Sequence, residues 1–170
     1  MTDKNPDITI RPATDKDWPG LWPLLKEVFS QGATYAFDPD ISEEEARQVW
    51  LTGPRACYVA VNNTAIVGSY YLKPNQPSLG AHVCNAGYVV APTARGMGLG
   101  RLLCLHSQGQ ARRLGFSAMQ FNLVAAGNHS AIHLWRSLGF EEVGRLPKAF
   151  RHASLGLMDA LIFYKWLGDN

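Results

Sequence analysis

Residues 87–105, GYVVAPTARGMGLGRLLCL, decide how the rest of the chain is interpreted. The apolar run at Tyr88–Val90 predicts a strand, and the leucines further on predict a helix. Between them lie Arg95 and three glycines at alternate positions, Gly96, Gly98 and Gly100. A strand, a glycine-rich turn and a helix N-terminus together point backbone N–H groups at an anion. The alternate glycines also suit a ligand that approaches the main chain closely. The stretch therefore predicts a site for a phosphorylated ligand.

Two better-known phosphate-binding motifs do not match this stretch. A P-loop has Lys and then Ser or Thr directly after its last glycine, whereas Gly100 is followed by Arg101 and Leu102. A dinucleotide fingerprint has the spacing G-x-G-x-x-G and an acidic residue about twenty positions further on. Here the spacing is G-x-G-x-G, and residues 116–124 contain no Asp or Glu. Both motifs are excluded.

The motif R-x-x-G-x-G at residues 95–100, preceded by Val90-x-Pro92, resembles the acyl-CoA pyrophosphate loop of the GNAT acetyltransferase superfamily. A second segment downstream is similar to another signature of that family and has the same order of residues, namely Asn128, Ala131, Leu134 and Leu138-Gly139-Phe140. The resemblance implies an acyl-CoA N-acyltransferase that uses acetyl-CoA as its acetyl donor.

The chain pattern predicts an α+β (mixed α/β) fold. Strands are expected at 8–11, 55–61, 65–72, 82–90, 116–124, 141–146 and 160–166. Helices are expected from Asp15 or Asp17 to Phe29, from Ser42 to Trp50, at 98–114 and at 128–139. The family resemblance further implies a central, mostly antiparallel seven-stranded sheet. Its fourth and fifth strands would splay apart, and about four helices would flank the sheet.

Composition narrows the class of protein. A chain of 170 residues suits one domain spanning residues 1–170, and its net charge of +2 is too small to indicate binding to nucleic acid or to a membrane surface. The three cysteines are odd in number and lie in apolar contexts, which favours a reducing compartment. The polar N-terminus MTDKNPD argues against a leader, and no apolar run reaches the length of a membrane span. We therefore expect a cytoplasmic protein.

The resemblance also implies which residues hold the cofactor. Acetyl-CoA would lie between the splayed strands, with its pantetheine arm paired like an extra strand to the backbone of Tyr88, Val89 and Val90. Backbone N–H groups would hold the pyrophosphate, from the residues Arg95, Gly96, Met97, Gly98, Leu99, Gly100 and Arg101. The Asn128 amide would reach the cofactor while it caps the following helix.

The groups that would move protons depart from a common family pattern. Trp135 occupies the position of a frequent tyrosine acid, and an indole N–H is a donor but not a usable acid. The predicted fourth strand also carries no Asp or Glu. We therefore expect protons to move through water, or His82 to take part. The simpler interpretation of His82 is a histidine at a strand end that faces solvent.

Asn85 and Asn122 are the candidate catalytic and acceptor-binding pair. Each is a polar residue within an apolar strand, and by register they are expected to face each other across the splayed strands. The competing interpretation is that free backbone groups of the split sheet satisfy both amides. The segment HVCNAGYVV at 82–90, with Asn122 and Asn128, also resembles acetyltransferases that act on azetidine-2-carboxylate. Tyr35 and Phe37 would form a lid over the acceptor, or would only pack.

The sequence thus predicts direct transfer of an acetyl group to the amine of a small molecule, such as an amino or imino acid. A protein N-acetyltransferase and a non-catalytic acyl-CoA-binding regulatory module remain as alternatives. We expect no metal, because His129 and His133 have the spacing of a zinc pair but no evident third ligand. The oligomeric state stays open, with a homodimer as one option.

Overall fold

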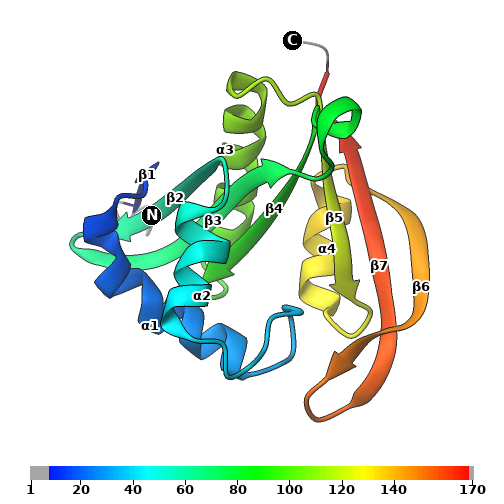
Figure 1. Cartoon of the computed structure of the whole chain (residues 1–170), viewed down its shortest axis with the longest axis horizontal. Coiled ribbons are helices and arrows are strands. Elements are labelled where there is room, and N and C mark those ends of the chain that lie inside the picture. Colours follow the sequence, from blue (N-terminus) through cyan, green and yellow to red (C-terminus); the bar gives the residue numbers. More distant parts are fainter. Residues whose placement is uncertain (1–7, 169–170) are drawn as a thin grey trace, which may run out of the picture.

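The computed structural model describes residues 8–168 (Figure 1). The polar segment 1–7, which argued against a leader, lies outside the described residues. One seven-stranded sheet has the strand order β1-β2-β3-β4-β5-β7-β6. Neighbouring strands are antiparallel except β4 and β5, which are parallel. The predicted α+β fold is confirmed.

The strands follow the expected order along the chain. Their bounds are β1 (Ile8–Pro12), β2 (Ala56–Asn62), β3 (Ala65–Pro74), β4 (Val83–Val90), β5 (Ala118–Ala125), β6 (Glu141–His152) and β7 (Gly156–Trp166). The last two strands are longer than predicted. β6 is an edge strand that is mostly exposed, so it lacks an apolar alternation, and its register shifts between Leu146 and Phe150. The strand continues through this irregularity, and its pairing with β7 resumes at Phe150, beyond the end at residue 146 that the sequence predicted.

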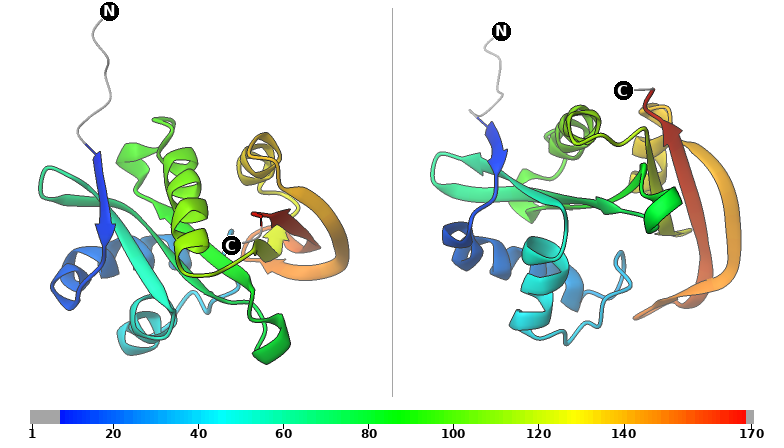
Figure 2. Two further views of the ribbon diagram at one scale, coloured as in Figure 1. Left: turned by 90° about the horizontal axis from the view of Figure 1, so that it is seen from above. Right: turned by 45° about the horizontal axis from the view of Figure 1, so that its top comes forward.

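Four α-helices pack on the two faces of the sheet: α1 (Trp18–Ser30), α2 (Glu43–Arg47), α3 (Leu99–Arg113) and α4 (His129–Ser137). A π-helical stretch, Gln48–Thr52, continues α2. Figure 2 shows α1 and α2 on one face and α3 on the other. The predicted capping box is present at α2, where the Ser42 hydroxyl accepts from the Glu45 N–H and the Glu45 carboxylate accepts from the Ser42 N–H.

The core continues through both faces of the sheet, and its largest fully buried side chains include Trp50, Tyr70, Phe29, Phe116 and Phe163. All three cysteines are buried with free thiols. No helix within residues 8–168 is both long enough and apolar enough to cross a membrane.

The feature that positions the site is the early end of the β4–β5 ladder. These strands pair only from Val83–Asn85 to Ala118–Gln120, and beyond this point they diverge (Figure 1). Aromatic rings pack together where the strands diverge. The rings of Tyr88 on β4 and Phe121 on β5 lie 5.9 Å apart, and Trp135 of α4 lies 5.3 Å from the first and 4.6 Å from the second. The predicted splay of the fourth and fifth strands therefore has an aromatic wedge as its physical basis.

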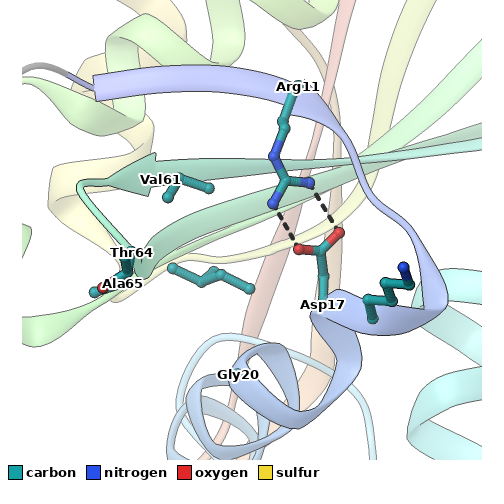
Figure 3. Close-up of a pocket in the computed structure, with 8 residues that line it drawn as sticks. Arg11, Asp17, Gly20, Val61, Thr64 and Ala65 are labelled. Carbon is teal, nitrogen blue, oxygen red and sulfur yellow. Dashed lines mark hydrogen bonds and ion pairs between the residues drawn. The ribbon is translucent and has the colours of Figure 1, made fainter.

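A small hollow at the other end of the sheet is organised by an ion pair (Figure 3). Arg11 on β1 donates two hydrogen bonds to the Asp17 carboxylate, at 2.9 and 2.7 Å. The same carboxylate accepts from the Thr14 N–H and hydroxyl, at 2.7 and 3.0 Å. These bonds tie the start of α1 to the first strand. They also leave the guanidinium of Arg11 engaged within the protein.

This ion pair predicts a defined loss of stability in acid. The Arg11 guanidinium lowers the pKa of Asp17 from its ordinary value near 4 to about 2. The ionised form therefore stabilises the fold above about pH 4, and this contribution is lost as the pH falls from about 4 to about 2. Asp17→Asn should lower the free energy of unfolding at neutral pH by about 1–3 kcal/mol and should flatten the stability profile over that acid range.

Urea unfolding at several pH values measures both effects. Asp15→Asn is the matched control, because Asp15 forms an exposed ion pair with Arg47, its side chain being 79% accessible. Such a pair contributes under about 1 kcal/mol. Equal losses in the two variants would show that the Asp17 carboxylate does not anchor α1.

Candidate functional site

A cleft of about 860 Å³ opens where β4 and β5 diverge. Its walls come from the segment between α1 and α2, from β4 and β5, from the glycine loop with the start of α3, and from α4. The structure brings together nearly all of the candidate residues, namely Tyr35, Phe37, Asn85, Tyr88, Val89, Val90, Arg95, Gly96, Gly98, Leu99, Gly100, Arg101, Asn122 and Asn128. Met97 is the exception, since its side chain is exposed and does not line the cleft.

The free edge of β4 faces this cleft. The Ala91 N–H donates to the Val67 carbonyl of β3, which fixes the phase of that ladder. Hydrogen-bonded and outward-facing residues alternate in an antiparallel pair. Tyr88 and Val90 therefore direct their backbone groups toward β5, beyond the point where the β4–β5 pairing ends.

Val89 corrects one expectation. It lines the cleft, but its register partner is Ser69, and by the same alternation its N–H and C=O are exchanged with β3. An extended ligand on the β4 edge can therefore pair with Tyr88 and Val90, but not with the backbone of Val89.

The glycine loop presents a run of free backbone donors. Gly96 and Gly98 have φ angles of +75° and +77°, a left-handed conformation that favours glycine. A Cβ atom at either position would meet nothing within 4 Å, so the backbone conformation, and not crowding within the chain, accounts for both glycines. The first hydrogen bond of α3 runs from the Leu102 N–H to the Gly98 carbonyl. The N–H groups of residues 99–101 consequently have no partner within the helix.

Positive charge surrounds these donors. The side chains of Arg95 and Arg101 are exposed at the loop and line the cleft. The N-terminal end of α3 adds its own partial positive charge. The buried Leu99 side chain packs into the core, so only its backbone is available to a ligand. This end of the cleft is built for an anion such as a diphosphate.

Asn128 has the capping role that the sequence predicts, and it has donors to spare. Its Oδ1 accepts from the Ala131 N–H at 3.3 Å and from the Ser130 hydroxyl at 3.2 Å. Its amide nitrogen has no hydrogen-bond partner within residues 8–168 and lies on the cleft wall. Capping and ligand contact are therefore compatible in this residue.

Tyr35 connects the segment between α1 and α2 to the open strand edge. Its hydroxyl donates to the backbone carbonyl of Tyr88. The ring stacks on Phe37, with centroids 5.8 Å apart and planes inclined by 10°, and it meets the edge of Trp50. Both residues line the cleft, and these contacts hold them by packing.

Asn85 and Asn122 both line the cleft, but they do not face each other in the expected way. The register partner of Asn85 is Gln120, and Asn122 lies two residues further along β5. The Asn85 amide donates to the Gln120 carbonyl at 3.0 Å, and its Oδ1 accepts from the Tyr71 hydroxyl at 3.1 Å. A backbone carbonyl therefore satisfies one hydrogen-bonding group of the Asn85 amide, in agreement with the competing interpretation that free backbone groups of the split sheet would do so. The exposed Asn122 bonds to the Gln120 and Asn75 side chains instead.

Tyr71 is a cleft residue that the sequence analysis missed. Its ring lies across Gly87, where a Cβ atom would come within 2.6 Å of the ring. The alternation of side chains along β3 was available as a signal, because it places Tyr71 on the opposite face from its neighbour Tyr70. Which face carries the cleft, however, depends on the split between β4 and β5.

The cleft contains no side chain that titrates near neutral pH. Burial raises the pKa of Tyr35 and of Tyr88, and it raises that of Tyr71 to about 12. No Asp or Glu is among the residues that line the cleft. His82 is exposed and lies outside it, which agrees with the simpler interpretation of that residue. Trp135 lines the cleft and packs in the aromatic wedge.

His129 and His133 both lie on α4, and no group of three His, Cys, Asp or Glu side chains suited to a metal occurs within residues 8–168.

Comparisons with known proteins agree with this geometry. A sequence model described as the Acetyltransferase (GNAT) family matches residues 18–140. N-acetyltransferase aca1 of Schizosaccharomyces pombe is 40% identical over 101 residues, which cover 59% of this chain and 48% of that protein. The chain thus spans about half the length of this curated relative.

Two solved structures cover nearly the whole chain. A GCN5-related N-acetyltransferase from Kribbella flavida is 41% identical, with a TM-score of 0.88 over 94% of this chain and 97% of that one. A ribosomal-protein-alanine N-acetyltransferase from Brucella melitensis is 30% identical, with a TM-score of 0.81 over 93% and 99% of the two chains.

The contact between Tyr35 and β4 predicts how the α1–α2 segment is held. Tyr35→Phe removes one partly buried hydrogen bond and should lower the free energy of unfolding by about 0.5–1.5 kcal/mol. It should also speed amide hydrogen exchange in residues 31–40, because the ring can pack but can no longer bond to Tyr88. Tyr58→Phe is the control, since it loses a bond to Gln110 outside the cleft. Unchanged exchange in residues 31–40 would show that aromatic packing alone holds the segment.

Proposed function

Because the chain belongs to the acetyltransferase (GNAT) family, we propose that it transfers an acetyl group from acetyl-CoA to the amine of a small molecule. The acceptor is an amino or imino acid, such as a proline analogue. Transfer is direct, in a ternary complex, and one domain spanning the chain carries it. The single observation that supports this proposal is a cleft with a cationic, N–H-rich end and an acceptor end whose lining has no charged side chain.

The donor end matches the chemistry of acetyl-CoA. The free N–H groups of residues 99–101, with Arg95 and Arg101, would hold its diphosphate. The open edge of β4 would pair with the amides of its pantetheine arm, in the manner of an added strand. Acetyl-CoA supplies the acetyl group as a thioester, and the Tyr88 N–H would polarise the thioester carbonyl. The amide nitrogen of Asn128 adds a further donor.

The acceptor end favours a molecule without net positive charge. Asn85, Asn122 and Tyr71 give it polar groups that are neutral. A polyamine or a lysine side chain would enter without an opposite charge to replace its hydration, which is costly in a partly closed site. An amino or imino acid carries its own carboxylate and avoids this cost.

The proton chemistry also constrains the acceptor. A nucleophilic amine must lose its proton before it attacks, and no residue of the cleft is a base near neutral pH. The acceptor must therefore arrive as its neutral form or lose its proton to water. An acceptor with a lower ammonium pKa has more of the neutral form at a given pH. The indole of Trp135 cannot protonate the departing thiolate, so water does so.

Two alternatives remain within reach of experiment. The name of the Brucella relative, a ribosomal-protein-alanine N-acetyltransferase, favours a protein N-acetyltransferase. Against a peptide acceptor, the Ala153 N–H donates to the Gly32 carbonyl at 2.9 Å. This bond bridges the turn between β6 and β7 and the segment after α1, and so narrows the acceptor side. The absence of a base among the cleft residues favours a non-catalytic acyl-CoA-binding module. Release of thiol from acetyl-CoA with a panel of amino acids, imino acids and peptides separates the three.

The donor assignment is tested with a charge placed in the glycine loop. Gly98→Glu should abolish binding of acetyl-CoA, because the carboxylate would lie against the diphosphate. Binding to the native state raises the melting temperature, so acetyl-CoA should stabilise the wild type but not this variant. Gly115→Glu is a matched control, since Gly115 also has a positive φ, of +87°, and open space, but lies at the far end of α3. Equal ligand shifts in both variants would refute the site.

The absence of a base among the cleft residues predicts an unusual pH dependence. The acidic limb of kcat/KM for the acceptor should move with the ammonium pKa of the acceptor, because deprotonation of the free amine sets it. Initial rates with several amino and imino acids of different ammonium pKa measure this. A limb that stays at one pH for every acceptor would reveal a base on the protein and would contradict the proposed proton path.

A further inference from the structure

The acceptor end of the cleft has more donors to offer than its internal bonds use. An asparagine amide has one oxygen and two N–H groups. In Asn85, the oxygen accepts from Tyr71 and one N–H donates to the Gln120 carbonyl. In Asn122, the oxygen accepts from Gln120 and one N–H donates to Asn75 at 2.7 Å. Each amide therefore keeps one N–H for a ligand, while its oxygen is already engaged.

Lys73 adds a positive charge beside these donors. It is the register partner of Asn85 on β3, and paired residues of neighbouring strands project from the same face of the sheet. Its ammonium lies 5.4 Å from the ring centroid of Tyr71, the residue whose hydroxyl bonds to Asn85. The Lys73 side chain is exposed and forms no ion pair with another residue of 8–168.

Charge and donors together select one kind of chemical group. Two spare amide N–H groups belong to residues that line a cleft without a carboxylate, and the Lys73 ammonium lies beside that cleft, over the ring of Tyr71. A carboxylate accepts through both of its oxygens, and its hydrogen bonds to a cation are stronger than those between neutral groups. A cationic group, in contrast, would find donors and like charge at this rim.

We propose that Lys73 is a specificity-determining residue that binds the carboxylate of the acceptor, together with the spare N–H groups of Asn85 and Asn122. This inference rests on the proposed function and names the chemical feature that the acceptor must carry. The carboxylate lies at the closed end of the β4–β5 split, beside Asn85. The amine on the neighbouring carbon then faces the gap between the strands, where Tyr88 presents its N–H.

The competing role for Lys73 is packing alone. Its alkyl chain and ammonium cover the ring of Tyr71, as Lys26 covers Trp22 on α1, where the ammonium lies 6.0 Å from the ring centroid. Loss of such a contact would affect stability and would reduce the use of every acceptor equally. Only binding to a carboxylate would discriminate between an acid and its uncharged amide.

The test compares azetidine-2-carboxylate with its carboxamide in the wild type and in Lys73→Met. The variant should lower kcat/KM for the acid by roughly 10-fold, mostly through KM, and should leave kcat/KM for the carboxamide nearly unchanged. Lys73→Arg should restore most of the preference for the acid. The melting-temperature shift given by acetyl-CoA should equal that of the wild type, because Lys73 does not line the donor end.

Lys26→Met is the matched control, since it removes an exposed lysine that also lies over an aromatic ring. This variant should leave kcat/KM unchanged for both the acid and the carboxamide. If Lys73→Met lowers kcat/KM equally for the acid and the carboxamide, or lowers it for neither, Lys73 does not bind the acceptor carboxylate. If the wild type acetylates peptides but neither of these two compounds, the proposed function itself fails. The two failures are therefore distinguishable.

Discussion

The rest of the structure depends on the point where β4 and β5 stop pairing. The Asn85 side chain bonds to the Gln120 backbone at the last rung of the ladder, and beyond it the rings of Tyr88, Phe121 and Trp135 pack against one another along the wall of the cleft. A strand edge with unpaired N–H and C=O groups is costly when it is buried. Here it opens onto a cleft, where a ligand with amides of its own can complete the pairing.

Neither end of this cleft has a negatively charged side chain in its lining. Free N–H groups of α3 and two arginines concentrate positive potential at the donor end. The acceptor end carries amides, a phenol and, at its rim, an ammonium, but its lining has no carboxylate. A cleft of this kind cannot deprotonate an acceptor with its own side chains. Binding and orientation are then the protein's main contributions, and the acceptor's own acidity decides how much of it can react.

The local features of the sequence predicted much of this arrangement. The spacing of Gly96 and Gly98, the capping box at Ser42 and the cap at Asn128 each depend on a few neighbouring residues, and the structure contains all three. The roles of Val89 and of Asn122 were harder to predict from the sequence, because they depend on which strand each residue pairs with. The alternation of β4 against β3 and the pairing of Asn85 with Gln120 are tertiary facts that no local pattern encodes. The long edge strand β6 was underestimated for the same reason.

The central claim, that the free edge of β4 and the start of α3 together hold acetyl-CoA, is tested most directly by amide hydrogen exchange with and without acetyl-CoA. The account predicts slower exchange at Tyr88 and Val90 and at residues 99–101, with no change at Val89, whose N–H already pairs with β3. Protection confined to the loop, with exchange along β4 unchanged at saturating ligand, would contradict it. In that case the split between β4 and β5 would serve something other than binding the donor.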